Sequence, residues 1–351
     1  MEKLATLGYD DQINTEAVRY INDDFSIARI IEVNKNSYTV ADGEHEMSGE
    51  LSGKFMFDAE NSTDYPTVGD WVAITIFDDN SLAIIHAVLP RKTVLKRKAS
   101  GKRIAFQLIA SNIDYGLIVQ SATNRNPNLL DRYFVMLNES GIHPIVVFTK
   151  TDLLSSQDFS VLQETLKESR HDYMMISNIN GEGIDTLIAM LIPGKTYCLL
   201  GQSGVGKTSL LNILLHENLF RVNDVREDGR GRHTTVRRQL IRLDSGSIFI
   251  DTPGIRELGN FSVEDGIDQT FQDIFSHASQ CRYADCTHTH ENGCAILEAV
   301  KNGEIEESRY KNYLKLKGES EFYEMSYLEK RKKDKTFGKM IKNYKKLRKN
   351  N

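Results

Sequence analysis

A glycine-rich segment in the middle of the chain has the residue types and spacing that bind nucleotide phosphates. Residues 201–208 read Gly-Gln-Ser-Gly-Val-Gly-Lys-Thr, after the apolar run 196–200 and before the helical pattern 209–215. Glycines let the backbone turn tightly enough for its N–H groups to surround phosphates, and the helix N-terminus adds a favourable dipole. The pattern predicts a phosphate loop in which Lys207 contacts the β- and γ-phosphates and Thr208 binds Mg²⁺. The predicted phosphate-site residues are Gly201, Gln202, Ser203, Gly204, Val205, Gly206, Lys207, Thr208 and Ser209.

A second motif, Thr-Lys-Thr-Asp at 149–152, precedes the phosphate loop, whereas an ordinary GTPase places its guanine-reading motif after that loop. It follows a strand pattern, so it falls where open parallel sheets bind ligands. The Asp152 carboxylate can accept two hydrogen bonds from the guanine edge while Lys150 covers the ring; adenine offers no such donor pair. Thr149 stands where the common motif has asparagine, which puts one contact to the base edge or to the loop in question. The predicted guanine-site residues are Thr149, Lys150, Thr151, Asp152, Ser177 and Asn178.

Two more segments have the character of switches that respond to the γ-phosphate. Asp-Thr-Pro-Gly at 251–254 follows a strand pattern, so we expect Asp251 near Mg²⁺ and the Gly254 N–H near the γ-phosphate. The segment Gly-Arg-Gly-Arg-His-Thr-Thr at 229–235 offers Thr234 or Thr235 as a Mg²⁺ ligand that is ordered only with GTP, and Thr235 is preferred.

The residue after the second switch motif departs from the common pattern. Ile255 occupies the position where many GTPases carry the glutamine that orients the attacking water. His233 is the nearest polar side chain able to hydrogen-bond that water. The predicted catalytic residues are His233, Lys207 and Thr235, and the predicted Mg²⁺ ligands are Thr208, Thr235 and Asp251.

The cysteines indicate a metal centre. Cys281, Cys286 and Cys294 crowd around His288, and three thiolates with one imidazole complete a tetrahedral structural zinc site without an open position. His290 is the alternative fourth ligand, and the absence of a C-x-x-C pair argues against redox chemistry. The remaining cysteine, Cys198, lies in the apolar run before the phosphate loop, where we expect it in the core.

Length and composition describe a globular protein of two or three domains. The chain has 351 residues, 40% of them hydrophobic and 26% charged, with no apolar run near the roughly 20 residues that span a bilayer. Its start lacks the pattern of a signal peptide, so we expect a cytoplasmic protein without a membrane partner. The mild net charge of −5 hides a basic tail over 330–349, in which Asp334 is the single acidic residue. Such a tail is suited to RNA phosphates.

Periodicity outlines the architecture. Alternating apolar residues over 25–95 with turn signals between them predict a small antiparallel barrel, of OB-like or SH3-like type. From residue 109 the rhythm becomes strand, helix, strand, as in an α/β fold, with one helix over 128–140.

The conjunction of T-K-T-D, G-Q-S-G-V-G-K-T-S, G-R-H-T-T, D-T-P-G and C-x4-C-x-H-x5-C resembles the RsgA/YjeQ family of circularly permuted GTPases across almost the whole chain. The resemblance implies a multidomain protein: an N-terminal all-β OB-like RNA-binding domain (1–97), a permuted α/β P-loop GTPase domain (98–262) and a mainly helical zinc domain with the basic tail (263–351). It chooses the OB-like barrel over the SH3-like one.

The same resemblance implies function. It implies a monomer that hydrolyses GTP to GDP and phosphate with Mg²⁺ and Zn²⁺, stimulated by the small (30S) ribosomal subunit, in whose late maturation it acts through rRNA contact. It also implies a part for His233 in hydrolysis. Gly204 stands where potassium-activated members carry asparagine, so we expect no potassium dependence. Whether the chain is the main member or a divergent paralogue stays open because of Thr149. The alternatives are an RNA-binding scaffold that holds nucleotide with little turnover, and a P-loop ATPase or kinase if Asp152 does not contact the base.

Overall fold

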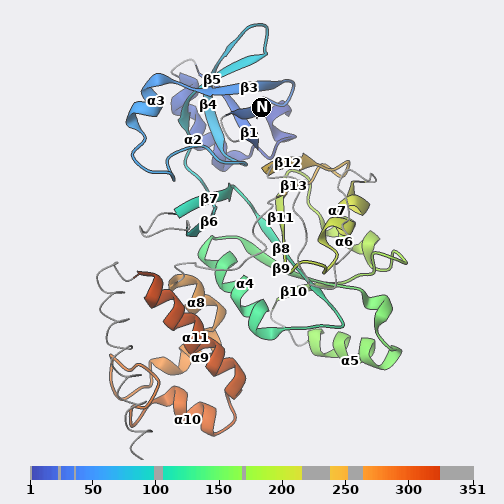
Figure 1. The fold of residues 1–351 in the computed structure, drawn as a ribbon, viewed down its shortest axis with the longest axis vertical. Helices are drawn as coiled ribbons and strands as arrows, with labels where there is room; N and C mark the ends of the chain where they lie inside the picture. The colour runs from blue at the N-terminus through green and yellow to red at the C-terminus, as the bar shows by residue number, and fades with distance from the viewer. Residues whose placement is uncertain are drawn as a thin grey trace, which may run out of the picture. The chain divides into compact units, whose positions relative to one another are not determined.

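A computed structural model describes residues 2–22, 25–34, 37–98, 106–167, 171–215, 238–251 and 264–324. The chain divides into two compact units, one comprising Met1–Lys96 and Leu108–Leu258, the other Arg97–Gln107 and Gly259–Asn351. The first unit contains the N-terminal barrel and an α/β sheet, and the second contains the C-terminal helices (Figure 1). Strands β6 (Val94–Lys98) and β7 (Phe106–Ser111) form a separate two-stranded sheet at the chain positions where the units divide.

Five strands near the N-terminus close into a barrel. They follow the order β1-β2-β3-β5-β4, with β4 returning to pair with β1. Neighbours are antiparallel except for β3 and β5, which run parallel. This closed five-stranded barrel confirms the predicted OB-like domain, a choice that alternation of apolar residues alone left open. The elements are α1 (Glu2–Ala5), α2 (Asp11–Asn22), β1 (Ser26–Val33), β2 (Tyr38–Ala41), β3 (Glu46–Leu51), α3 (Gly53–Asp58), β4 (Trp71–Phe77) and β5 (Leu82–Val88).

The barrel has apolar packing both inside it and against α2. Along β3, exposed and buried residues alternate, as period-2 side-chain geometry requires. Ile30, Met47 and Ile85 belong to one fully buried cluster, and α2 packs Ile13 against the cluster that contains Trp71. Side chains of one strand therefore serve two faces, which explains the alternating pattern in the sequence.

A six-stranded sheet follows, in the order β10-β9-β8-β11-β13-β12. Its first five strands are parallel, and β12 is antiparallel to β13. The strand before the phosphate loop, β11, lies between β8 and β13, although β8 precedes it by about 80 residues. The elements are β8 (Tyr115–Ser121), α4 (Pro127–Glu139), β9 (His143–Thr149), a 3-10 turn (Thr151–Leu153), α5 (Ser156–Lys167), β10 (Asp172–Met175), α6 (Ile184–Met190), β11 (Thr196–Leu200), α7 (Lys207–Leu214), β12 (Arg238–Arg242) and β13 (Ile248–Asp251).

The predicted helix before the guanine motif is present and begins one residue earlier than the pattern indicated. Asn126 accepts a hydrogen bond from the Leu129 N–H through its side chain, and Pro127 takes the first helical position. The chain leaves the helix at Gly141, whose φ of +69° is readily adopted only by glycine. These local signals explain where α4 begins and ends, and the helix packs on β8 and β9.

The barrel and the α/β sheet are joined within the first unit by a strand pair and a buried arginine. Strand β1 pairs with β12 through Glu32 and Val33. Arg29 is fully buried, and its guanidinium donates to the carbonyls of Leu7, Gly69 and Asn112 and to the Thr196 hydroxyl. Burial lowers the pKa of Arg29 to about 10, so the group stays charged at neutral pH. Four acceptors compensate for the loss of water around this charge.

The second unit contains four described helices: α8 (Glu264–Thr270), α9 (Gln272–Ala278), α10 (Ala295–Lys301) and α11 (Glu307–Glu324). Arg309 of α11 donates to both carboxylate oxygens of Asp273 on α9, at 2.6 and 2.8 Å, and also to the Thr270 carbonyl. Phe271 and Tyr313 pack edge to face beside this pair. Among the described segments, no helix has the length and apolar character that crossing a bilayer requires.

Candidate functional site

The phosphate loop connects β11 to α7 and is held close to the neighbouring strand. Gly201 has φ +137°, and a Cβ at this position would lie 2.2 Å from the Val119 carbonyl oxygen of β8. Gly206 has φ +98° and precedes the first turn of α7. Both positions require glycine, one for backbone approach and the other for a left-handed turn. The tight backbone turns that the sequence motif predicts at these two glycines are therefore present.

Lys207 and Thr208 begin α7, at the end of the helix that favours anions. The Lys207 ammonium donates to the carbonyls of Gly201, at 2.6 Å, and Gln202, so its charge lies over the loop. The loop residues Gln202, Ser203 and Gly204 are exposed, whereas Val205 is buried and anchors the loop in the core. Residues 202–204 are therefore accessible to a ligand, while Val205 fixes the loop to the core of the sheet.

Thr149, the departure from the common guanine motif, contacts the phosphate loop directly. Its side chain is fully buried, and its hydroxyl lies 2.6 Å from the Val205 carbonyl oxygen and 3.2 Å from that of Gln120. The next residue, Lys150, adopts a left-handed conformation with φ +60°, which is uncommon for a residue with a side chain. The threonine therefore braces the phosphate loop even though it replaces the asparagine of the common motif.

The Asp152 carboxylate, predicted to contact guanine, is oriented by a residue that follows the next strand. The Ser177 hydroxyl donates to Asp152 Oδ1 at 2.6 Å and accepts from the N–H groups of Ile179 and Asn180 at 3.2 and 3.3 Å. Ser177 is fully buried, so this contact holds Asp152 in one orientation. A carboxylate has about four acceptor positions, and one hydroxyl leaves enough for a guanine edge.

Asn178 also faces the phosphate loop. Its side-chain amide donates to the Gly206 carbonyl at 3.0 Å. Ser177 and Asn178 follow β10, and sequence reasoning could place them near the base only weakly. In the structure Ser177 contacts the Asp152 carboxylate, and Asn178 contacts the phosphate loop.

The predicted Mg²⁺ residues lie partly within the described chain. Thr208 is in the first turn of α7, and Asp251 ends β13, which runs parallel to the strand leading into the phosphate loop. A hydroxyl and a carboxylate at the carboxyl edge of adjacent strands fit a hard cation. Four other predicted residues, His233, Thr234, Thr235 and Gly254, together with Ile255, lie outside the described residues.

The buried thiol of the first unit takes no part in this site. Cys198 lies inside β11 and is fully buried. Burial raises the pKa of its thiol to about 12, which leaves it protonated and unreactive.

The four predicted zinc ligands come together in the second unit. The ligand atoms of Cys281, Cys286, His288 and Cys294 all lie within 4.8 Å of one another. His288 Nδ1 is 3.5 Å from Cys281 Sγ and 3.6 Å from Cys294 Sγ, and those two sulfurs are 3.9 Å apart. Tetrahedral zinc with ordinary bond lengths gives edges of about 3.6 Å from nitrogen to sulfur and about 3.8 Å between sulfurs. The cluster is therefore consistent with zinc in both composition and geometry.

The loop around this cluster favours His288 over His290. His288 is buried with φ +62°, and its carbonyl accepts from the Tyr310 hydroxyl at 2.6 Å. His290 is exposed, and its Nδ1 lies 2.7 Å from the Thr289 hydroxyl. Glu291 accepts from the backbone N–H groups of this loop. Its pKa is held far below the usual range, chiefly by the Thr287 hydroxyl.

Sequence reasoning missed the residues that support the two sites. Glu291 and Tyr310 hydrogen-bond the loop that carries His288, and neither was predicted. The contact by which Ser177 orients Asp152 was not predicted either. Thr287 and Glu291 are only four residues apart, so the sequence offers a local signal for their hydrogen bond. The Tyr310 contact spans 22 residues and has no such signal.

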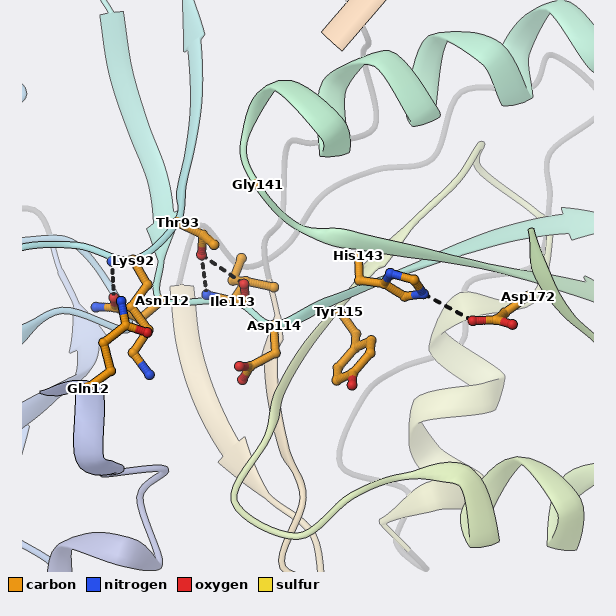
Figure 2. Close-up of a pocket in the computed structure, with 10 residues that line it drawn as sticks. All are labelled: Gln12, Lys92, Thr93, Asn112, Ile113, Asp114, Tyr115, Gly141, His143 and Asp172. Carbon is orange, nitrogen blue, oxygen red and sulfur yellow. Dashed lines mark hydrogen bonds and ion pairs between the residues drawn. The ribbon is translucent and has the colours of Figure 1, made fainter. Parts of the chain in front are cut away.

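A separate polar pocket opens at the opposite edge of the sheet (Figure 2). Its volume is about 530 Å³, and Tyr115, His143 and Asp172, which begin β8, β9 and β10, contribute to its lining. His143 Nε2 lies 3.0 Å from Asp172 Oδ2, but both side chains are more than half exposed. Thr149 lies at the other end of β9, six residues from His143. At roughly 3.3 Å per residue, the two are about 20 Å apart. This pocket is therefore distinct from the predicted nucleotide site.

Comparisons with known proteins agree with these features. The sequence model of the RsgA GTPase family matches residues 88–261. A protein of Leptospira interrogans named small ribosomal subunit biogenesis GTPase RsgA is 35% identical, with 92% of this chain and 89% of that protein aligned. RsgA 1 of Bacteroides thetaiotaomicron is also 35% identical, over 99% and 98% of the two chains.

Solved structures show the same architecture. The structure of YjeQ from Thermotoga maritima matches with a TM-score of 0.64 and 28% identity, over 84% of this chain and 98% of that one. That of YloQ, described as a circularly permuted GTPase, matches with a TM-score of 0.62 and 25% identity, over 85% and 95% of the two chains. The permuted order of motifs is therefore shared with proteins of known structure.

Proposed function

The chain belongs to the RsgA GTPase family, and from that premise we propose how its residues bind and hydrolyse GTP during maturation of the small ribosomal subunit. The observation that carries the proposal is the contact between Thr149 and Val205, at 2.6 Å. It brings the guanine motif against the phosphate loop although the motif comes first in the chain. Sheet order, and not chain order, assembles a GTP site here.

We assign a role to each part of the proposed GTP site. Asp152 accepts from the guanine edge, Ser177 holds that carboxylate, and the Lys150 stem covers the base. The phosphate loop surrounds the phosphates with N–H groups, and Lys207 places its ammonium beside them. Thr208 and Asp251, with Thr235, would hold Mg²⁺, which supplies charge neutralisation on the phosphates when bound. These side chains orient the nucleotide before any proton moves.

Hydrolysis requires a group that orients the attacking water. Ile255 has no hydrogen-bonding side chain, so we assign this role to His233 in the switch segment 229–235. Contact with the small subunit then positions the histidine at the γ-phosphate and triggers hydrolysis. The side chain then acts only in the stimulated reaction.

The test is single-turnover GTP hydrolysis by wild type and His233→Ala, each with and without isolated small subunits. We expect stimulation in the wild type and at least a tenfold lower stimulated rate in the variant, with GDP affinity unchanged. An unchanged stimulated rate would remove His233 from the reaction, and no stimulation of the wild type would remove the subunit as its partner.

The charge of the chain restricts where rRNA is bound. Residues 1–97 contain seventeen Asp and Glu against nine Lys and Arg, a net charge of −8. Glu46 and Glu50 are exposed on β3, and Asp78 and Asp79 are exposed after β4. The resemblance implies rRNA contact by both the barrel and the basic tail. Carboxylates repel phosphates, so we assign the main contact to the tail 330–349 and exclude only these acidic surfaces of the barrel. Loss of subunit binding on truncation at residue 329 is the expected result.

Zinc fits a structural role in the second unit. Three thiolates and one imidazole fill a tetrahedral site and leave no position for a reacting water. With zinc bound, His288 and the cysteines would join α9, α10 and the loop between them, and the metal would stabilise the fold around it.

A further inference from the structure

Two side chains from successive strand ends hold two successive carbonyls of the phosphate loop. Thr149, at the end of β9, places its hydroxyl 2.6 Å from the Val205 carbonyl oxygen. Asn178, after β10, donates its amide to the Gly206 carbonyl at 3.0 Å, and that carbonyl also accepts from the Leu210 N–H of α7 at 2.9 Å. Both side chains belong to the predicted guanine site, so the two contacts join the guanine part of the nucleotide site to its phosphate part.

The chemistry of the two groups determines how each contact is used. A hydroxyl has one proton, so Thr149 donates to the nearer acceptor, Val205, and not to Gln120 at 3.2 Å. The orientation of the Asn178 amide is fixed because the reverse orientation would set its oxygen against the Gly206 carbonyl. Asn178 Oδ1 is buried and receives no hydrogen bond from the described residues. The amide nitrogen of Asn178 therefore donates to the phosphate loop.

Gly206 lies so close to this amide that a side chain at position 206 would not fit. A Cβ at Gly206 would lie 2.8 Å from Asn178 Nδ2 and 3.9 Å from Thr149 Oγ1. Glycine at this position therefore meets two requirements, a positive φ and close approach of the amide.

Holding a carbonyl also aims an N–H group. In a trans peptide the C=O and the N–H point in opposite directions, and the described peptides include no cis bond. The Val205 carbonyl shares its peptide with the Gly206 N–H, and the Gly206 carbonyl shares its peptide with the Lys207 N–H. Thr149 holds the Val205 carbonyl, and Asn178 holds the Gly206 carbonyl together with the Leu210 N–H of α7, so both N–H groups face away from Thr149 and Asn178. These are N–H groups of the kind that a phosphate loop uses to surround phosphates.

We propose that Thr149 and Asn178 form a two-point brace that positions the Gly206 and Lys207 N–H groups for the nucleotide phosphates. Threonine at position 149 lacks the amide that asparagine has in the common motif. Asn178, which follows the next strand, supplies an amide instead. The brace rests on the proposed GTP site and adds a division of labour to it. Asp152 selects the base, while Thr149 and Asn178 set how tightly the phosphates are held.

The test measures release of fluorescent mant-GDP from the full-length protein, chased with excess GDP. Thr149→Val keeps the side-chain shape and leaves the buried Val205 carbonyl without a donor; we expect release to be about tenfold faster. Asn178→Ala removes the second contact, with release about fivefold faster. Because the two contacts hold adjacent peptides, the double variant should fall short of the product of the single effects. Thr149→Ser keeps the hydroxyl and should release GDP at close to the wild-type rate.

Two comparisons separate positioning from general damage. Asn180→Ala changes an exposed asparagine of the same loop, whose side chain accepts from the Glu182 N–H and does not touch the phosphate loop; its release rate should match the wild type. The preference for GDP over xanthosine diphosphate should be unchanged in the brace variants and reversed in Asp152→Asn. A wild-type release rate in Asn178→Ala overturns the brace. Failure of the wild type to bind mant-GDP instead overturns the proposed GTP site itself.

Discussion

The metal centre and the nucleotide site are built in opposite ways. All four candidate zinc ligands come from one continuous segment, 281–294. The nucleotide residues come from the ends of several strands, and Thr149 reaches Val205 across 56 residues. A local segment carries its geometry in its own spacing, whereas an assembled site requires the sheet to pair in the correct order. The two sites should therefore fail independently and for different reasons.

Loss of the metal gives the largest expected effect. Structural zinc contributes on the order of 10–16 kcal/mol of binding free energy, comparable to or larger than the stability of a typical domain, about 5–15 kcal/mol. Chelation, or Cys294→Ser, should remove stable packing from α8–α11 while mant-GDP binding by the first unit persists. Zinc content by atomic absorption and limited proteolysis mapped by mass spectrometry will show this. Loss of nucleotide binding together with zinc would contradict the separation of the two sites.

A matched pair of histidine variants sharpens the same prediction. His288→Ala should lose zinc and protease resistance, because His288 Nδ1 faces the thiols. His290→Ala should keep both, because His290 is exposed and contacts Thr289 instead. The reverse result would reassign the fourth ligand.

The counterpart in the first unit is Arg29, whose contacts extend over as many as 167 residues. Its guanidinium joins the barrel to Thr196, the first residue of the strand that leads into the phosphate loop. Arg29→Met leaves buried acceptors without a donor and should lower the free energy of unfolding by about 3–5 kcal/mol. Denaturation followed by fluorescence of Trp71, the single tryptophan, reports on this unit.

The control for Arg29 is Arg19→Met, which changes an exposed arginine of α2 and should cost no more than about 0.5 kcal/mol. The protease resistance of the second unit should be unaffected by either variant. An Arg29→Met protein with the wild-type midpoint would show that the barrel and the sheet do not depend on this contact.

The smallest expected effect concerns pH. Asp10 pairs with Lys92 and accepts from the Ile13 N–H at 3.1 Å. Burial raises the pKa of the Asp10 carboxyl, but the hydrogen bonds from Lys92 and Ile13 outweigh it, and the pKa is lowered. A lowered folded-state pKa stabilises the protein above the unfolded value of about 3.9 and loses that contribution as pH falls through the folded value.

Asp10→Asn tests this pair, because asparagine caps a helix as well as aspartate and removes only the charge. The carboxyl is partly exposed, so the wild type should be more stable by at most about 1 kcal/mol at pH 7. The difference should shrink as pH falls from about 5 to 3, in denaturation followed by Trp71 fluorescence. A difference that does not change with pH would assign the effect to packing.

Sequence reasoning predicted most accurately where structure is local. The apolar run 196–200 corresponds to β11, and the Asn126-Pro127 cap and Gly141 place α4 within a residue of the prediction. Contacts between distant segments could not be predicted in this way. Nothing in the neighbourhood of Asn178 indicates that its amide reaches Gly206, and alternation alone could not choose between two barrel types. The barrel type depends on the order in which strands pair, which periodicity does not contain.

The sequence by itself determined the chemistry of the two sites. It contained the phosphate loop, the Asp152 carboxylate and a set of thiols and imidazole spaced for a tetrahedral metal, because those functions depend on residue type and short spacing. Tertiary structure alone decided how the permuted parts meet. Parallel pairing of β8, β9, β10 and β11 brings the ends of distant strands to one edge, where Thr149 and Asn178 hold the phosphate loop. Hydrogen bonds act through space, so the order of motifs along the chain does not limit which of them can form.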